Sequence, residues 1–167
     1  MTNDPASAAL DRGHSGDPYA RLAALGLSLP QSPTPIANFR PATREGDMIF
    51  LSGQGPTEAS GRLHTGKVGD DVSAAEAYQH ARLTGLNLIS VLHDAVGDLR
   101  RVRRIVKLFG MVNATPDFAE HSQVIDGCSD LFFEVFGEPG AHSRTAIGVN
   151  SLPRLITVEI EAIVAVD

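Results

Sequence analysis

The spacing of apolar and polar residues changes several times along the chain, and each change predicts a new element. Residues 36–43 and 47–53 are two β-rich runs, and the polar residues 44–47 between them predict a hairpin turn. Ser73 and Glu76 have the S-x-x-E spacing of a capping box. Apolar residues then recur at helical spacing, so we predict one long amphipathic helix over residues 73–96.

The second half of the chain predicts another strand, another helix and two final strands. Residues 102–113 predict the strand, and the helix is expected from residue 115 to about residue 136, with a proline in its first turn. Residues 142–167 contain two β-rich runs around Leu152-Pro153, and the short connection predicts that they are antiparallel neighbours. The order β-β-α-β-α-β-β indicates an α+β sandwich, with the helices on one face of one sheet. Because the other face also needs cover, we expect self-association.

The N-terminal part has a different character. Residues 1–17 are rich in Asp, Ser, Gly, Ala and Pro, which is typical of a flexible arm. Residues 19–26 predict a short helix, and the proline-rich residues 29–35 predict an extended linker. We therefore expect an N-terminal arm over 1–35 and one compact domain over 36–167.

Composition narrows the class of protein. The apolar fraction of 43% suffices for a core, and no apolar run approaches the roughly 18 residues that a membrane span needs. The N-terminus has no basic start followed by an apolar stretch, so no secretory signal is expected. The single cysteine excludes an internal disulfide framework and fits a reducing cytoplasm, where we expect the protein. A net charge of −6 argues against a nucleic-acid partner.

The C-terminal tail carries the charges that most need an explanation. Arg144 lies in its first β-rich run, and Glu159 and Glu161 lie in its second. Charges inside apolar β patterns are unfavourable unless they are paired or used. Arg144 and Glu159 could bind a substrate carboxylate and handle protons, or form a structural ion pair at a subunit interface. The residues alone favour the structural interpretation.

Three motifs together resemble the Rid family, also called YjgF or L-PSP. The family's tail has an arginine, a Leu-Pro and a glutamate within an (I/V)-E-(I/V)-E-A-I strand, which match Arg144, Leu152-Pro153 and residues 158–163. Residues 50–54 (FLSGQ) resemble the family's S-G-Q, and residues 117–119 (DFA) give a third, weaker match. The resemblance covers about residues 36–166 in collinear order.

The resemblance implies both a fold and a function. The fold would be chorismate-mutase-like, with two long helices on one face of a mixed sheet, and the protein would be a homotrimer with clefts between subunits. Family members with the arginine typically hydrolyse reactive enamines or imines, such as 2-aminoacrylate, to a keto acid and ammonia. Arg144 would hold the substrate carboxylate, Glu159 would position or activate water, and Ser52, Gly53 and Gln54 would line the cleft. No metal or organic cofactor is required for this reaction.

Some positions depart from the family pattern. Phe39 stands where many members have a tyrosine, and Ala146 where many have a cysteine. Asp126 falls where an asparagine is often found, and a carboxylate there would repel an anionic substrate. Cys128 and His142 are further candidates for the pocket, although a structural thiol and a rim histidine are the favoured interpretations. A larger enamine, such as an aminomuconate, therefore stays open as a substrate.

Two other functions stay open at this point. The same pocket could bind a small carboxylate metabolite without turnover. The family also carries an older endoribonuclease label, and residues 100–107 are rich in arginine and lysine. However, Phe109 is the only aromatic residue nearby for base stacking, and no pair of histidines at close spacing suggests RNA cleavage. The scattered histidines and the lone cysteine also predict no metal site.

Overall fold

The computed structural model describes residues 16–32, 34 and 38–167. Its helices and strands, in chain order, are α1 (Pro18–Ala24), β1 (Ala42–Glu45), β2 (Met48–Gln54), α2 (Ala74–Val96), β3 (Val102–Asn113), α3 (His121–Phe136), β4 (Ser143–Val149) and β5 (Val158–Val166). Short 3-10 turns occupy Leu99–Arg101, Glu138–Gly140 and Pro153–Leu155. No helix in these described ranges is long and apolar enough to cross a membrane.

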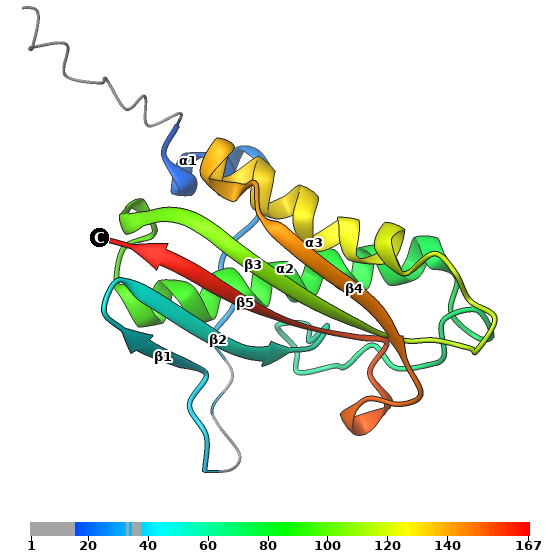
Figure 1. Cartoon of the computed structure of the whole chain (residues 1–167). Helices are drawn as coiled ribbons and strands as arrows, with labels where there is room; N and C mark the ends of the chain where they lie inside the picture. The colour runs from blue at the N-terminus through cyan, green and yellow to red at the C-terminus, as the bar shows by residue number, and fades with distance from the viewer. Residues whose placement is uncertain (1–15, 33, 35–37) are drawn as a thin grey trace, which may run out of the picture.

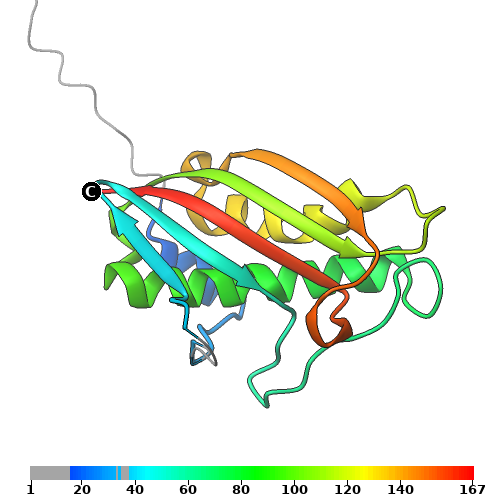
Figure 2. The ribbon, with the colours of Figure 1, turned by 60° about the horizontal axis from the view of Figure 1, so that its bottom comes forward.

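The strands form one mixed sheet in the order β1-β2-β5-β3-β4. The β3–β4 pair is parallel and the other pairs are antiparallel. Helices α2 and α3 lie side by side along one face of this sheet, as Figures 1 and 2 show from two directions. The predicted α+β arrangement, with two long helices on one face of a mixed sheet, is confirmed.

Local sequence explains how α2 begins, ends and packs. The Ser73 hydroxyl accepts the Glu76 backbone N–H while the Glu76 carboxylate accepts the Ser73 N–H, so the predicted capping box is present. Gly97 ends the helix in a left-handed conformation with φ of 75°. Gly127 of α3 lies so close to α2 that a Cβ on it would fall on the carbonyl oxygen of Tyr78. The two helices therefore pack almost backbone to backbone at this point.

The central strand β5 separates the two faces of the sheet. Val158, Ile160, Ala162 and Val164 are buried beneath the helices, whereas Glu159, Glu161 and Ile163 point to the other face, as alternation predicts. Within the described residues no helix covers that second face (Figure 2). We call it the open face. Its exposed apolar side chains include Phe50 from β2 and Ile147 from β4.

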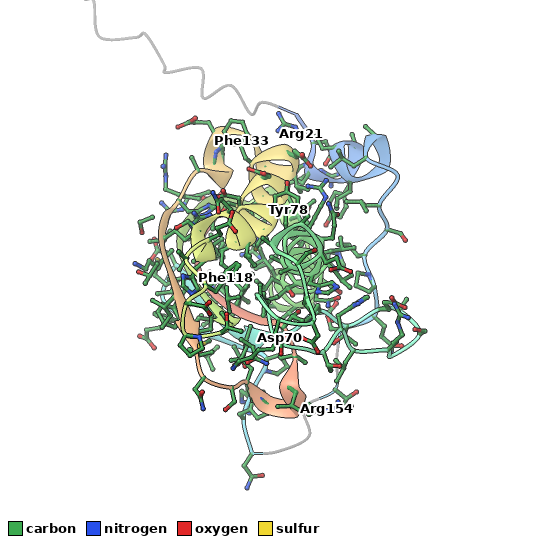
Figure 3. All side chains as sticks on the ribbon, turned by 90° about the vertical axis from the view of Figure 1, so that its right-hand side faces the viewer. Arg21, Asp70, Tyr78, Phe118, Phe133 and Arg154 are labelled. Carbon is green, nitrogen blue, oxygen red and sulfur yellow. The ribbon has the colours of Figure 1, made fainter. Side chains whose placement is uncertain are left out.

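The two tail strands are not neighbours, so that prediction was wrong. Strand β3 lies between them, in register with β4 on one side and β5 on the other. The connection from β4 to β5 therefore crosses the end of β3. It turns through Arg154 and Leu155, which both have positive φ, and Arg154 lies at the side of the molecule opposite the helices (Figure 3).

Two predicted boundaries also need correction. The helix expected from residue 115 begins at His121, because residues 115–118 form a turn in which the Phe118 N–H donates to the Thr115 carbonyl. The strand expected over 36–43 begins only at Ala42, and residues 35–37 lie outside the described part of the chain. The strand predicted over 102–113 and the helix predicted over 73–96 are confirmed.

Of the N-terminal predictions, the short helix is confirmed. It is α1, and its Leu22 joins the core while the Tyr19 hydroxyl accepts the Leu99 N–H. The flexible arm was predicted for 1–17, of which residues 1–15 lie outside the described residues. The same holds for parts of the linker, and the division into arm and domain stays a prediction.

Candidate functional site

Arg144 lies on β4 and points towards the helices. Its register partner on β3 is Leu108, a core residue, so the side chain shares the helix-covered face of the sheet. There its Nη1 donates to Asp126 Oδ1 at 2.7 Å and to Ser129 Oγ at 2.9 Å, both on α3. Asp126 and Ser129 are one helical turn apart, which brings both oxygens to the same guanidinium. The arginine side chain is only 21% exposed, whereas that of Asp126 is 45% exposed.

A hydrogen-bonded chain continues from Arg144 through Ser129 to His142. His142 Nδ1 lies 2.6 Å from the Gly140 carbonyl oxygen, which can only accept, so this nitrogen carries a hydrogen. His142 Nε2 therefore accepts the Ser129 hydroxyl at 3.0 Å. Burial lowers the pKa of His142, and the charge of Arg144 lowers it further, against the opposing effect of the Gly140 hydrogen bond. The neutral imidazole thus fits the arrangement of its neighbours.

Cys128 lies in the core between α2 and α3. Its side chain is fully buried, and its sulfur would lie 3.1 Å from a Cβ placed on Gly85 of α2. Burial raises the pKa of the Cys128 thiol, and the nearby charge of Arg144 does not offset that effect. The thiolate needed for nucleophilic chemistry is therefore disfavoured at this position.

Glu159 lies on the open face, on the side of the sheet opposite Arg144. Its register partner on β3 is Met111, and its carboxylate lies over Gly53 of β2, where a Cβ would meet Glu159 Oε1. Burial raises the pKa of Glu159, and the charge of Glu161 raises it further. Within one chain, Arg144 and Glu159 therefore do not converge, which leaves an arrangement across a subunit interface as the one in which they could meet.

The other expected cleft residues fall in three places. Ser52 donates its hydroxyl to the Arg40 carbonyl at 2.7 Å, beside Gly53 at the end of β2. Gln54 is 8% exposed, and it lines a cavity of about 350 Å³ together with Asn87 of α2. Phe39 is 49% exposed in the segment before β1. Glu159 and Gly53 are thus in direct contact, while Arg144, Asp126 and His142 form a separate group.

Two features were missed by reasoning from sequence. Ser129 joins Arg144 to His142, and its spacing of three residues from Asp126 was a signal that could have indicated it. The second feature is a stacked pair, His64 and His80, whose ring centroids are 4.3 Å apart. These histidines come from a loop and a helix, so no local spacing could have paired them. Burial lowers the pKa of His80 to about 4.

Neither a metal centre nor an open basic patch is evident in the parts that the structure describes. No group of three or more His, Cys, Asp or Glu side chains there could hold a metal ion. Of the basic residues predicted to form a cluster, Arg100 pairs with Asp17 and Asp98, and Arg103 pairs with Asp47. Much of the positive charge at the start of β3 is thus matched within the chain.

The mixed sheet, the two helices on one face and the arginine on the edge strand together define a known class of protein. The family described as "YjgF/chorismate_mutase-like, putative endoribonuclease" matches residues 19–162. This chain therefore belongs to the YjgF family, and the resemblance seen in its motifs is confirmed.

Individual relatives extend this result. The chain is 40% identical over 154 residues to "Protein TCP17" of Trypanosoma cruzi, across 92% of this chain and 96% of that protein. It is 26% identical over 142 residues to a 2-iminobutanoate/2-iminopropanoate deaminase of Dermatophagoides farinae, across 84% of this chain and 95% of that protein. The crystal structure of the protein Atu1372 from Agrobacterium tumefaciens, whose function is unknown, matches with a TM-score of 0.83 at 43% identity, across 90% of this chain and 94% of that one.

Proposed function

We propose that this protein hydrolyses reactive enamines or imines related to small 2-amino acids, releasing ammonia and a carbonyl product, which is a keto acid for the simplest substrates. The observation that carries the proposal is Arg144, which matches the arginine of the family's tail motif and is held by Asp126 and Ser129 in a partly exposed edge site. The similarity to the iminobutanoate deaminase of Dermatophagoides farinae supports the same reaction class.

We further propose that the working site lies between subunits of a homotrimer. Arg144 and Glu159 point to opposite faces of one sheet, so they can act on one substrate only if a second copy supplies one of them. The apolar side chains on the open face, such as Phe50 and Ile147, support self-association through that face. Glu159 would then be enclosed near the interface that these apolar residues form.

The chemistry needs few groups. A protonated imine carbon is electrophilic, and water adds to it to give a carbinolamine, which then expels ammonia. Glu159 would accept a proton from the attacking water, and a carboxylate whose pKa is raised by burial is a stronger base than an exposed one. Arg144 would hold the group next to the imine carbon, and this positioning accounts for most of the required catalysis.

The test is ammonia release from freshly generated 2-iminopropanoate and 2-iminobutanoate, measured above the spontaneous rate. Arg144→Ala should lower kcat/KM by about 100-fold or more, as expected for loss of a charged binding group. Glu159→Gln should lower kcat by about 100-fold. Glu161→Gln is the matched control, because Glu161 lies on the same face of β5 two residues away. Its kcat should stay close to that of the unchanged protein.

The assignment is wrong if Arg144→Ala leaves the rate unchanged while light scattering shows an unchanged oligomer. Tight binding of 2-oxobutanoate without hydrolysis above the spontaneous rate would instead assign the site to a metabolite-binding protein. RNA cleavage is disfavoured, since the ion pairs of Arg100 and Arg103 reduce the charge available for a phosphate backbone.

A further inference from the structure

The charge of Arg144 is already matched by an internal carboxylate. Asp126 accepts from Nη1 at 2.7 Å, and Ser129 accepts from the same nitrogen at 2.9 Å. Both hydrogen bonds that this guanidinium makes with the described residues use Nη1, so Nε and Nη2 are the donors left for a ligand. A ligand that used them would lie beside the Asp126 carboxylate, which is partly exposed.

Among the described residues, Arg144 is the cation that forms an ion pair with Asp126. Asp130 and Glu134 follow Asp126 on α3 at successive intervals of four residues, so the three carboxylates lie along one stripe of the helix. Asp130 accepts the hydroxyl of Tyr78, and the guanidinium of Arg82 pairs with Glu134. His142, the other basic group in the Arg144 cluster, is kept neutral by burial, which lowers its pKa.

The charge of Asp126 favours uncharged ligands over anionic ligands at Arg144. A ligand carboxylate bound at Nε and Nη2 would face the Asp126 carboxylate within several ångströms, in a site whose arginine is largely withdrawn from solvent. If the ligand displaced Asp126 instead, it would break the existing ion pair. An uncharged carbonyl oxygen can accept the same N–H groups without either penalty. The electrostatic difference corresponds to roughly ten- to hundredfold in affinity at the effective dielectric of a protein surface.

We propose that Asp126 is a specificity-determining residue that sets this site for imines whose carbon carries an uncharged carbonyl group, such as an amide or ester, rather than a carboxylate. The inference rests on the proposed function for the identity of the reaction. The binding preference itself rests on the ion pair between Asp126 and Arg144.

The first experiment measures binding of two stable probes of matched shape to the full chain by calorimetry or NMR titration. These are 2-oxobutanoate, which is anionic, and 2-oxobutanamide, which is neutral. The unchanged protein should bind the amide more tightly. Asp126→Asn should strengthen 2-oxobutanoate binding by about tenfold or more and change amide binding by less than about twofold. Asp130→Asn, which removes the next carboxylate on the same helix, is the matched control and should change neither.

Three results would overturn the proposal: tighter binding of 2-oxobutanoate than of the amide by the unchanged protein, no change in the preference in Asp126→Asn, or no saturable binding of either probe by any variant. Thermal unfolding of each variant checks that it is folded.

Hydrolysis of 2-iminobutanoate and of its amide is measured in parallel. If no variant hydrolyses either imine but the binding preference still depends on Asp126, the proposed reaction fails and the role of Asp126 in selecting the ligand stands. If hydrolysis occurs but Asp126→Asn does not favour the acid, the reaction stands and the specificity proposal fails.

Discussion

Two regions of the molecule contain charged groups that differ in their ion pairing. One is the edge formed by α3 and β4, and the other is the open face of the sheet around β5. At the edge, Arg144 donates from Nη1 to Asp126 and Ser129, so its charge is paired within one chain while Nε and Nη2 stay available to a ligand. On the open face, Glu159 and Glu161 lie two residues apart on one strand, and neither forms an ion pair with a described residue. The charges of the edge are therefore paired within one chain, whereas those of the open face lie where we propose that a second copy packs.

The largest expected effect compares one glycine from each region. A Cβ on Gly127 would fall on the backbone carbonyl of Tyr78, and a Cβ on Gly53 would fall on the carboxylate of Glu159. Helix backbone cannot move aside, whereas the end of a glutamate side chain can rotate away. Gly127→Ala should therefore lower the free energy of unfolding by about 3 kcal/mol, and Gly53→Ala by less than about 1 kcal/mol.

Urea unfolding followed by circular dichroism measures both values. The comparison also has a functional side, since Gly53→Ala should displace Glu159 and lower imine hydrolysis even though the fold is retained. Equal losses of stability in the two variants would show that Glu159 is fixed as firmly as helix backbone, and the contrast between the regions would then be wrong.

The next effect concerns pH at the edge cluster. Burial, with the charge of Arg144, lowers the pKa of His142 in the folded state, so the unfolded chain takes up a proton more readily. The stability that depends on neutral His142 is therefore present above its ordinary value near 6.5 and declines as the pH falls below it. Protonation would also put a hydrogen on Nε2, so the Ser129 hydroxyl could no longer donate to that nitrogen and would have to turn.

His142→Gln should consequently lose less stability than the unchanged protein between pH 7.5 and pH 5. The expected difference is about 1 kcal/mol or less, because the side chain is only partly buried. Unfolding is measured for both proteins at each pH, so that the contributions of the other titrating groups cancel. Parallel curves over this range would mean that His142 is not coupled to the stability of the edge cluster.

The same contrast explains what could be predicted from sequence. The S-x-x-E spacing correctly located the start of α2, because it depends on residues close together in the chain, and alternation along β5 accounts for the position of Glu159 on the open face in the same way. The pairing of β4 with β3 could not be predicted in this way. It is a parallel, non-local contact, so the short connection to β5 was misleading. The partners of Arg144 come from a helix and depend on that pairing.

The smallest expected effect is the contribution of Glu159, on the open face, to the pH dependence of stability. Its sign is opposite to that of the contribution of His142. Burial, with the charge of Glu161, raises the pKa of Glu159 in the folded state above its ordinary value of 4.5. The folded chain holds the proton more tightly, so stability falls as the pH rises through 4.5 and beyond. Glu159→Gln removes this penalty and should raise the free energy of unfolding at pH 7 by a few tenths of a kcal/mol.

The gain should shrink as the pH falls through 4.5, where the carboxyl group becomes protonated in both states. Glu161→Gln should give a gain of the same sign at pH 7, because it removes the neighbouring charge. Lower stability of Glu159→Gln at pH 7 would be the more informative result. It would mean that Glu159 is stabilised by a cation that does not belong to the described residues of its own chain. If adding Arg144→Ala to that variant then caused no further loss, the two residues would be coupled, and the arginine of one copy would be paired with the glutamate of another.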